Sequence, residues 1–116
     1  MSRFQITFNG LVIGHTDFEF GDPPMGVAFG RFDATANYSH FQSAFATEPY
    51  SAYKELRAIT PDGESIECAG LSVEDFSGDF GEQEIQITAL GISKPPYSKL
   101  FPQHVQLYDQ QFPSAP

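Results

Sequence analysis

Turn residues, above all glycine and proline, recur at short intervals in this chain, and no long helical period appears. The 116 residues include ten Gly and nine Pro. Gly weakens regular elements by its backbone freedom, and Pro interrupts them because it lacks an N–H group. The stretches between these residues alternate apolar and polar side chains, which is the period of half-buried strands. We therefore expect many short strands, and no internal repeat is visible.

Two segments show this alternation most clearly. Residues 4–8 alternate, and Asn9-Gly10 then supplies the two positive-φ positions of a type I′ turn. Residues 11–13 return as the second strand, so the first segment predicts a β-hairpin. Residues 84–89 alternate equally well, with Ile and Ala on one side and Glu, Gln and Thr on the other.

Residues 15–20 also alternate and predict a strand. Its two faces would carry Thr16, Phe18 and Phe20 on one side and His15, Asp17 and Glu19 on the other. The glycines and prolines of residues 21–26 predict a stiff loop. Residues 27–32 predict the next strand, and residues 65–68 predict the return strand after a turn at residues 60–63.

Helical spacing occurs in two places. Tyr38, Phe41 and Phe45 fall on one helical face after Asn37, and Pro102 can open a last helix. Residues 49–59 fit either a helix or a strand, and we favour a strand over residues 53–59 because a hairpin turn follows.

These elements predict one small α+β domain, mainly antiparallel β-sheet. We expect about six or seven short strands with two short helices packed on them. The domain covers residues 1–112, and residues 113–116 form a frayed C-terminal tail. The predicted core contains Phe4, Ile6, Phe8, Phe18, Ile66, Ile85 and Ile87.

Composition limits where the chain works and what it binds. One Cys excludes an internal disulfide, and no apolar run reaches the ~20 residues of a membrane-spanning helix. No secretory signal is visible at the N-terminus, so we expect a cytoplasmic protein. The net charge of −9 repels phosphate groups and disfavours binding to nucleic acids or to anionic membranes.

No motif of a metal, phosphate or nucleophile site is present, so we predict no catalytic residue, no bound metal and no cofactor. Cys68 lies in an acidic segment that opposes thiolate formation, and His40 and His104 are expected at the surface. One alternative site stays open. His15, Asp17 and Glu19 on one strand face could act as general base or ligands, or only as a solvated edge.

The acidity is concentrated between Asp62 and Glu84, where eight acidic residues occur without a single Lys or Arg. Glu67, Glu74 and Glu84 each follow or precede an apolar residue that should point inward, so we expect these three on one outer sheet face. Such a face favours a basic protein partner. Including the rigid loop, the predicted partner-binding residues are Asp22, Met25, Glu67, Glu74, Asp79 and Glu84.

The sequence therefore favours a non-enzymatic protein-interaction domain. Its sharpest version is an acidic inhibitor or immunity-type protein that binds a basic partner. Two alternatives remain: a small enzyme or ligand-binding domain that uses the His15/Asp17 face, and a structural subunit of a larger assembly. A pocket walled by His15 would favour the first, and a symmetric interface the second.

Overall fold

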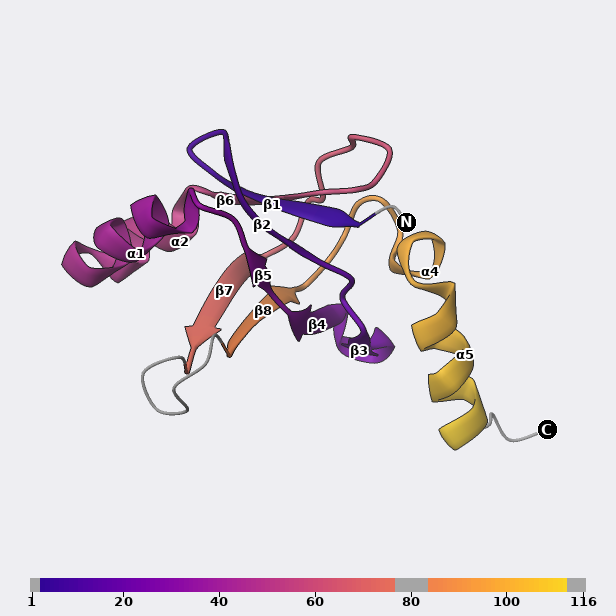
Figure 1. The fold of residues 1–116 in the computed structure, drawn as a ribbon. Coiled ribbons are helices and arrows are strands. Elements are labelled where there is room, and N and C mark those ends of the chain that lie inside the picture. Colours follow the sequence, from indigo (N-terminus) through magenta and orange to yellow (C-terminus); the bar gives the residue numbers. More distant parts are fainter. Residues whose placement is uncertain (1–2, 77–83, 113–116) are drawn as a thin grey trace.

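Eight strands form two antiparallel sheets in the computed structural model, which describes residues 3–76 and 84–112 (Figure 1). Sheet A has the strand order β5-β2-β1-β6, and sheet B has the order β3-β4-β8-β7. The strands are β1 (Phe4–Phe8), β2 (Leu11–Thr16), β3 (Phe20–Asp22), β4 (Val27–Arg31), β5 (Asp33–Ala34), β6 (Leu56–Ile59), β7 (Gly70–Asp75) and β8 (Ile85–Leu90). The α+β class is confirmed, with slightly more strands than expected.

The β1–β2 hairpin forms as predicted. Asn9 and Gly10 have φ values of 51° and 83°, as a type I′ turn requires, and Phe8 pairs with Leu11 across it. The register shifts between Ile6 and Thr7, where an irregularity in the ladder bends the hairpin.

The predicted strand over residues 15–20 is wrong. β2 ends at Thr16, and the backbone turns at Phe18, whose φ is 47°, before β3 begins. The Phe18 N–H donates a hydrogen bond of 3.1 Å to the Thr16 hydroxyl oxygen, which supports this turn. The chain thereby crosses from sheet A to sheet B, so Phe18 is fully buried and Phe20 is 57% exposed.

Helices stand at both ends of the sheets (Figure 1). The described residues form η1 (Pro23–Met25), α1 (Tyr38–Thr47), α2 (Pro49–Lys54), α4 (Tyr97–Leu100) and α5 (Pro102–Gln111), more than the two helices predicted. The predicted strand over residues 53–59 is wrong at its start. Helix α2 continues through Lys54, Glu55 follows as its C-cap, and β6 begins at Leu56. Residues 65–68 form isolated bridges at Ser65 and Glu67 instead of a strand.

The core lies between the inner faces of the two sheets. Of the seven predicted core residues, six are buried and Phe4 packs against them. Phe101 joins the core just before α5, with its ring 5.5 Å from Phe4 and 5.8 Å from Phe18 between centroids. His104 is also buried, contrary to expectation, and its Nε2 lies 2.7 Å from the carbonyl oxygen of Phe18.

No helix in residues 3–76 and 84–112 has the length and apolar character to span a membrane.

Candidate functional site: the outer face of sheet B

The strand register of sheet B fixes which side chains point away from the core. Phe20 pairs with Phe29, and Phe29 pairs in turn with Thr88 and Thr88 with Ser72, so these four form one row across the outer face. On one side of this row, the outer face continues with Asp22, Val27 and Leu90. On the other side, it continues with Arg31, Gln86, Glu74, Phe76 and Glu84.

Apolar side chains occupy the centre of this face. Phe20 and Phe29 stack with their ring centroids 5.4 Å apart. Leu90 is 46% exposed, and Val27 lies beside it in the next strand. Large apolar groups that gather on a solvent-facing sheet mark a binding surface more often than scattered single residues do.

Carboxylates border this apolar centre. Asp22 ends β3, Glu74 lies on β7, and Glu84 pairs with Phe76 beside the start of β8. Met25, 67% exposed, lies in η1, directly after β3. Three of the six predicted partner-binding residues, Asp22, Glu74 and Glu84, therefore border one face, and Met25 is exposed next to β3.

The other two do not join them. Glu67 lies in the connection between β6 and β7, where its backbone bridges to Lys94, so the prediction that it shares a face with Glu74 and Glu84 is wrong. Asp79 is outside the described residues.

A shallow hollow of about 190 Å³ opens beside the apolar centre, between the ends of β4 and β8. Its lining includes Phe20, Phe76, Glu84 and Arg31. The Arg31 side chain forms an ion pair with Asp33, with its Nε 3.6 Å from a carboxylate oxygen. The hollow could receive a side chain of a bound protein next to Glu84.

Aromatic groups beneath the sheet hold this face in place. The Tyr97 hydroxyl donates a hydrogen bond of 2.8 Å to the Val27 carbonyl oxygen from below. Burial, assisted by the charge of Asp22, raises the pKa of Tyr97 to about 12. Gly21 faces Tyr97 and His104 so closely that an added Cβ would overlap both side chains. The glycine lets α4 and α5 support β3.

Sequence reasoning missed Phe20 and Phe29 as members of this face. A local signal existed for Phe29, because Val27, Phe29 and Arg31 share one parity while Ala28 and Gly30 share the other. A charged Arg on the larger side indicates the outer face, and the small residues face inward. No such signal marked Phe20, since the turn at Phe18 reverses the expected parity.

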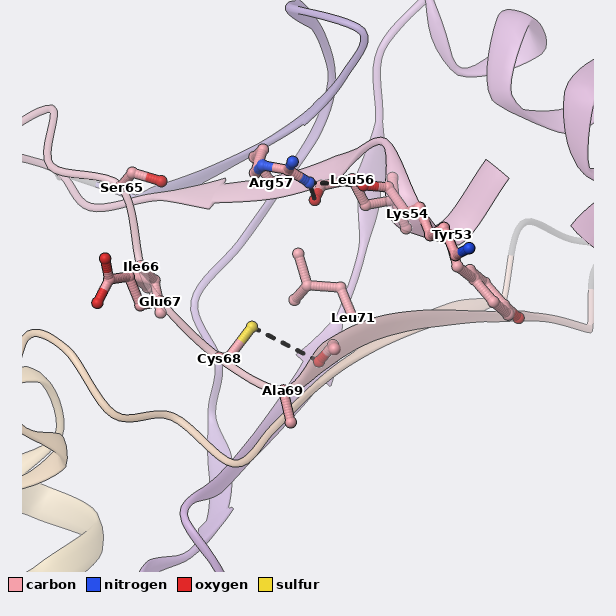
Figure 2. A pocket seen from close by; sticks show the side chains of 11 residues that line it. Tyr53, Lys54, Leu56, Arg57, Ser65, Ile66, Glu67, Cys68, Ala69 and Leu71 are labelled. Carbon is pink, nitrogen blue, oxygen red and sulfur yellow. Dashed lines mark hydrogen bonds between the residues drawn. The ribbon is translucent and has the colours of Figure 1, made fainter. Parts of the chain in front are cut away.

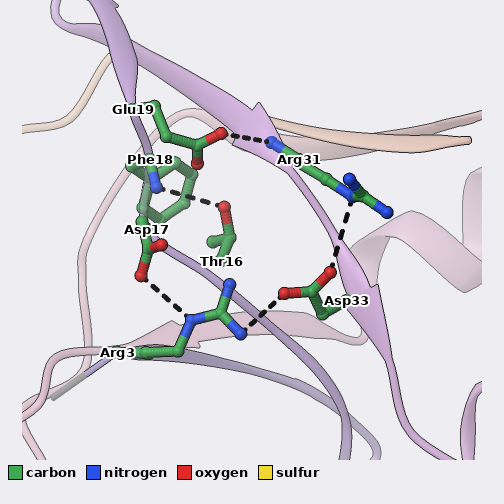
Figure 3. A network of polar contacts seen from close by, with 7 residues as sticks. All are labelled: Arg3, Thr16, Asp17, Phe18, Glu19, Arg31 and Asp33. Atoms are coloured by element: carbon green, nitrogen blue, oxygen red, sulfur yellow. Dashed lines mark hydrogen bonds and ion pairs between the residues drawn. The ribbon is translucent and has the colours of Figure 1, made fainter. Parts of the chain in front are cut away.

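The same turn, which Figure 3 shows with Asp17, Phe18 and Glu19, divides the alternative site. His15 lies in β2 opposite Asp33, whereas Asp17 and Glu19 follow the end of the strand. Arg3 joins Asp17 at 2.9 Å and Asp33 at 2.7 Å. These contacts tie the N-terminal strand to the crossing between the sheets. Within the described residues, no group of three or more His, Cys, Asp or Glu side chains could hold a metal ion.

A larger cavity, of about 520 Å³, lies between β6 and β7 (Figure 2). The Cys68 thiol points into it and contacts the Gly70 carbonyl oxygen at 3.6 Å. Burial raises the pKa of Cys68, so the thiol stays protonated near neutral pH. The sequence did not predict that Cys68 lines a cavity.

Comparisons with known proteins found no protein-family model, no curated protein and no solved structure that matches the chain.

Proposed function

We propose that this protein is a non-enzymatic interaction domain that binds a basic protein through the outer face of sheet B. The observation that carries the proposal is the apolar centre at Phe20, Phe29 and Leu90, bordered by Asp22 and Glu74. Protein interfaces commonly combine an apolar centre, which loses its water on binding, with a polar rim.

Charge complementarity selects the kind of partner. The chain carries −9, and Asp22, Glu74 and Glu84 border the surface, with Arg31 as the cation on it. Lys and Arg side chains of a partner would pair with these carboxylates and speed association. The most specific version of this proposal is an inhibitor or immunity-type protein that covers a basic surface of its partner.

The same charges argue against a symmetric dimer through this face. Two copies would place the carboxylates of each rim near those of the other, and like charges across an interface oppose association. This surface therefore supports binding to a partner of opposite charge more than it supports the alternative of a structural subunit.

The enzyme alternative also draws little support. Asp17 is engaged by Arg3 at 2.9 Å, and it does not share a strand face with His15. His15 and Asp17 line neither of the two cavities described above. Glu19 lines the smaller one, where its carboxylate accepts a hydrogen bond of 3.1 Å from the Arg31 N–H.

The rigidity of the surface favours tight binding. Phe20 and Phe29 lie on paired strands and stack on each other, and Tyr97 fixes the strand below them. A preorganised surface loses little conformational entropy when a partner docks.

The proposal is tested by quantitative capture from a native lysate with three immobilised forms of the protein. These are the wild type, Phe20→Ser, and the double variant Glu74→Gln with Glu84→Gln. A true partner is a basic protein that is retained by the wild type and reduced with both variants. With that protein purified, the double variant should associate more slowly, and its rate should depend less on salt.

A matched control removes two exposed carboxylates elsewhere: Glu55→Gln with Glu64→Gln has the same net charge as the rim variant. This control should retain the partner and the association rate. If both double variants slow association equally, net charge alone is responsible and the proposed surface is wrong. A captured partner that is acidic would also contradict the proposal.

A further inference from the structure

Sheets A and B approach each other at a second place, where β6 and β7 are the outermost strands and do not pair with one another. We call this gap the seam, and the cavity of about 520 Å³ lies in it (Figure 2). One end is closed by the Tyr53 hydroxyl, which donates to the Val73 carbonyl oxygen at 3.1 Å. The other end is closed by the Ile66 N–H, which donates to the Ala58 carbonyl oxygen at 2.9 Å.

The ladder registers turn backbone polar groups toward the seam. In antiparallel ladders, alternate residues direct their N–H and C=O groups away from the paired strand. Val73 is such a residue, because its carbonyl oxygen accepts from Tyr53 across the seam. Leu71 has the same parity in β7, so its N–H and C=O also turn toward the seam. The cavity wall therefore offers a backbone donor beside apolar side chains.

Lys54, Leu56 and Arg57 line one side of the cavity, and Leu71 lines the facing side (Figure 2). Leu56 and Leu71 supply apolar walls, and Lys54 and Arg57 supply positive charge. Figure 2 shows the carboxylate of Glu67, also a lining residue, directed away from Leu71.

These two cations are unusual in this acidic chain, which has six Lys and Arg residues in total. The ion pairs among the described residues involve Arg3 and Arg31. Arg57 instead donates from one Nη1 to the carbonyl oxygens of Lys54 and Leu56, both at 2.7 Å. Backbone carbonyls hold the guanidinium in place without neutralising its charge.

We propose that the seam cavity binds a small organic carboxylate with an apolar body. The carboxylate would pair with Lys54 and Arg57, and the apolar body would fill the space between Leu56 and Leu71. The closed ends exclude an extended strand that runs through the seam, and the volume lies in the range of small-molecule pockets. This inference concerns a different surface from the proposed protein interface and stands without it.

The test uses 4-phenylbutyrate as probe and 4-phenylbutanol as its uncharged analogue. Cys68 is the only cysteine in the chain and lines the cavity, so its alkylation by iodoacetamide reports occupancy. At ten times the dissociation constant, 4-phenylbutyrate should slow alkylation about tenfold. The backbone amide NMR signals of Leu56, Cys68 and Leu71 should shift with the same saturation curve.

Charge removal separates the anion site from a merely apolar cavity. Lys54→Gln and Arg57→Gln should each weaken 4-phenylbutyrate binding at least about fivefold, since each removes one cation. Lys54 makes no side-chain hydrogen bond among the described residues, so Lys54→Gln keeps the test valid if Arg57→Gln alters the strand edge. Lys99→Gln, in α4, is the matched control and should leave binding unchanged.

Three results would overturn the inference. The first is 4-phenylbutanol protecting Cys68 as well as 4-phenylbutyrate does. The second is Lys99→Gln weakening binding as much as Lys54→Gln. The third is that millimolar 4-phenylbutyrate leaves the rate of Cys68 alkylation and the amide NMR signals of Leu56, Cys68 and Leu71 unchanged.

Discussion

The outer faces of the two sheets differ in composition although both sheets have four antiparallel strands. The outer face of sheet A carries mainly polar side chains, such as Gln5, Thr7 and His15. The outer face of sheet B carries Phe20 and Phe29 at its centre. Both sheets bury their inner faces in one core, so folding alone does not require aromatic groups on the outside of sheet B. The difference separates residues that make the fold from residues available to a partner.

The largest effect is expected on the inner face of sheet B. Ile87 is completely buried in the middle of β8, and Ile87→Ala removes its packing and leaves a cavity. We expect the free energy of unfolding to fall by about 2–5 kcal/mol. Chemical denaturation measures this change, and a loss below about 1 kcal/mol would contradict the assignment of inner and outer faces.

The inner face of sheet A should tolerate added volume poorly. Gly14 lies against the ring of Phe32, where an added Cβ would overlap the ring atoms. We expect Gly14→Ala to cost about 1–3 kcal/mol of unfolding free energy. Gly70→Ala is the control, because no atom lies near its added Cβ and its φ is ordinary. Equal unfolding free energies of the two variants would contradict this prediction.

The support beneath sheet B should depend on pH in the alkaline range. The pKa of Tyr97 is about 12 in the folded protein, above the usual value of about 10. The folded state therefore prefers the protonated hydroxyl. This stability is fully present below about pH 10 and is lost as the pH rises toward 12.

Tyr97→Phe should flatten this alkaline loss of stability. Part of the loss should remain, because burial and the hydrogen bond to Asp75 raise the pKa of Tyr38 in the same direction. Urea denaturation between pH 9 and about 11.5 measures the slope. Tyr50→Phe serves as control because the Tyr50 side chain is 85% exposed. An unchanged slope in the Tyr97 variant would show that its hydroxyl does not support β4.

The smallest effect on stability is expected at the centre of the outer face. Phe20→Ser removes an exposed ring and its stack on Phe29, so the unfolding free energy should change by less than about 1 kcal/mol. Partner binding should nevertheless weaken strongly. A large loss of stability would assign Phe20 to the fold and remove the main difference between the two faces.

Residue patterns within short segments were sufficient to predict the first hairpin and the strand β8. Asn9-Gly10 defines its hairpin by backbone preference alone, and the alternation of residues 84–89 sets which side of β8 is buried. The class of fold and most of the core followed from these signals.

The crossing between the sheets could not be predicted in this way. A positive φ at Phe18 is unfavourable for a bulky residue, and it persists through contacts with distant groups such as Arg3 and His104. Alternation continued through Phe18 puts Phe20 on the same face as Phe18, so the pattern does not predict that Phe20 is exposed. Glu67, Glu74 and Glu84 were predicted on one outer face, but Glu67 lies in the connection between β6 and β7. The apolar centre beside Glu74 and Glu84 depends on strand pairing and was not predicted.

The turn at Phe18 also has a consequence for how the protein is made. It is held from one side by Arg3, which engages Asp17, and from the other by His104, whose ring contacts the Phe18 carbonyl. Residues from both ends of the described chain must therefore be present before this corner is complete. During synthesis the growing chain can close its first hairpin early, but the joint between the sheets stays unfinished until α5 has emerged. The corner that joins the two sheets is consequently completed only when residue 104 is in place.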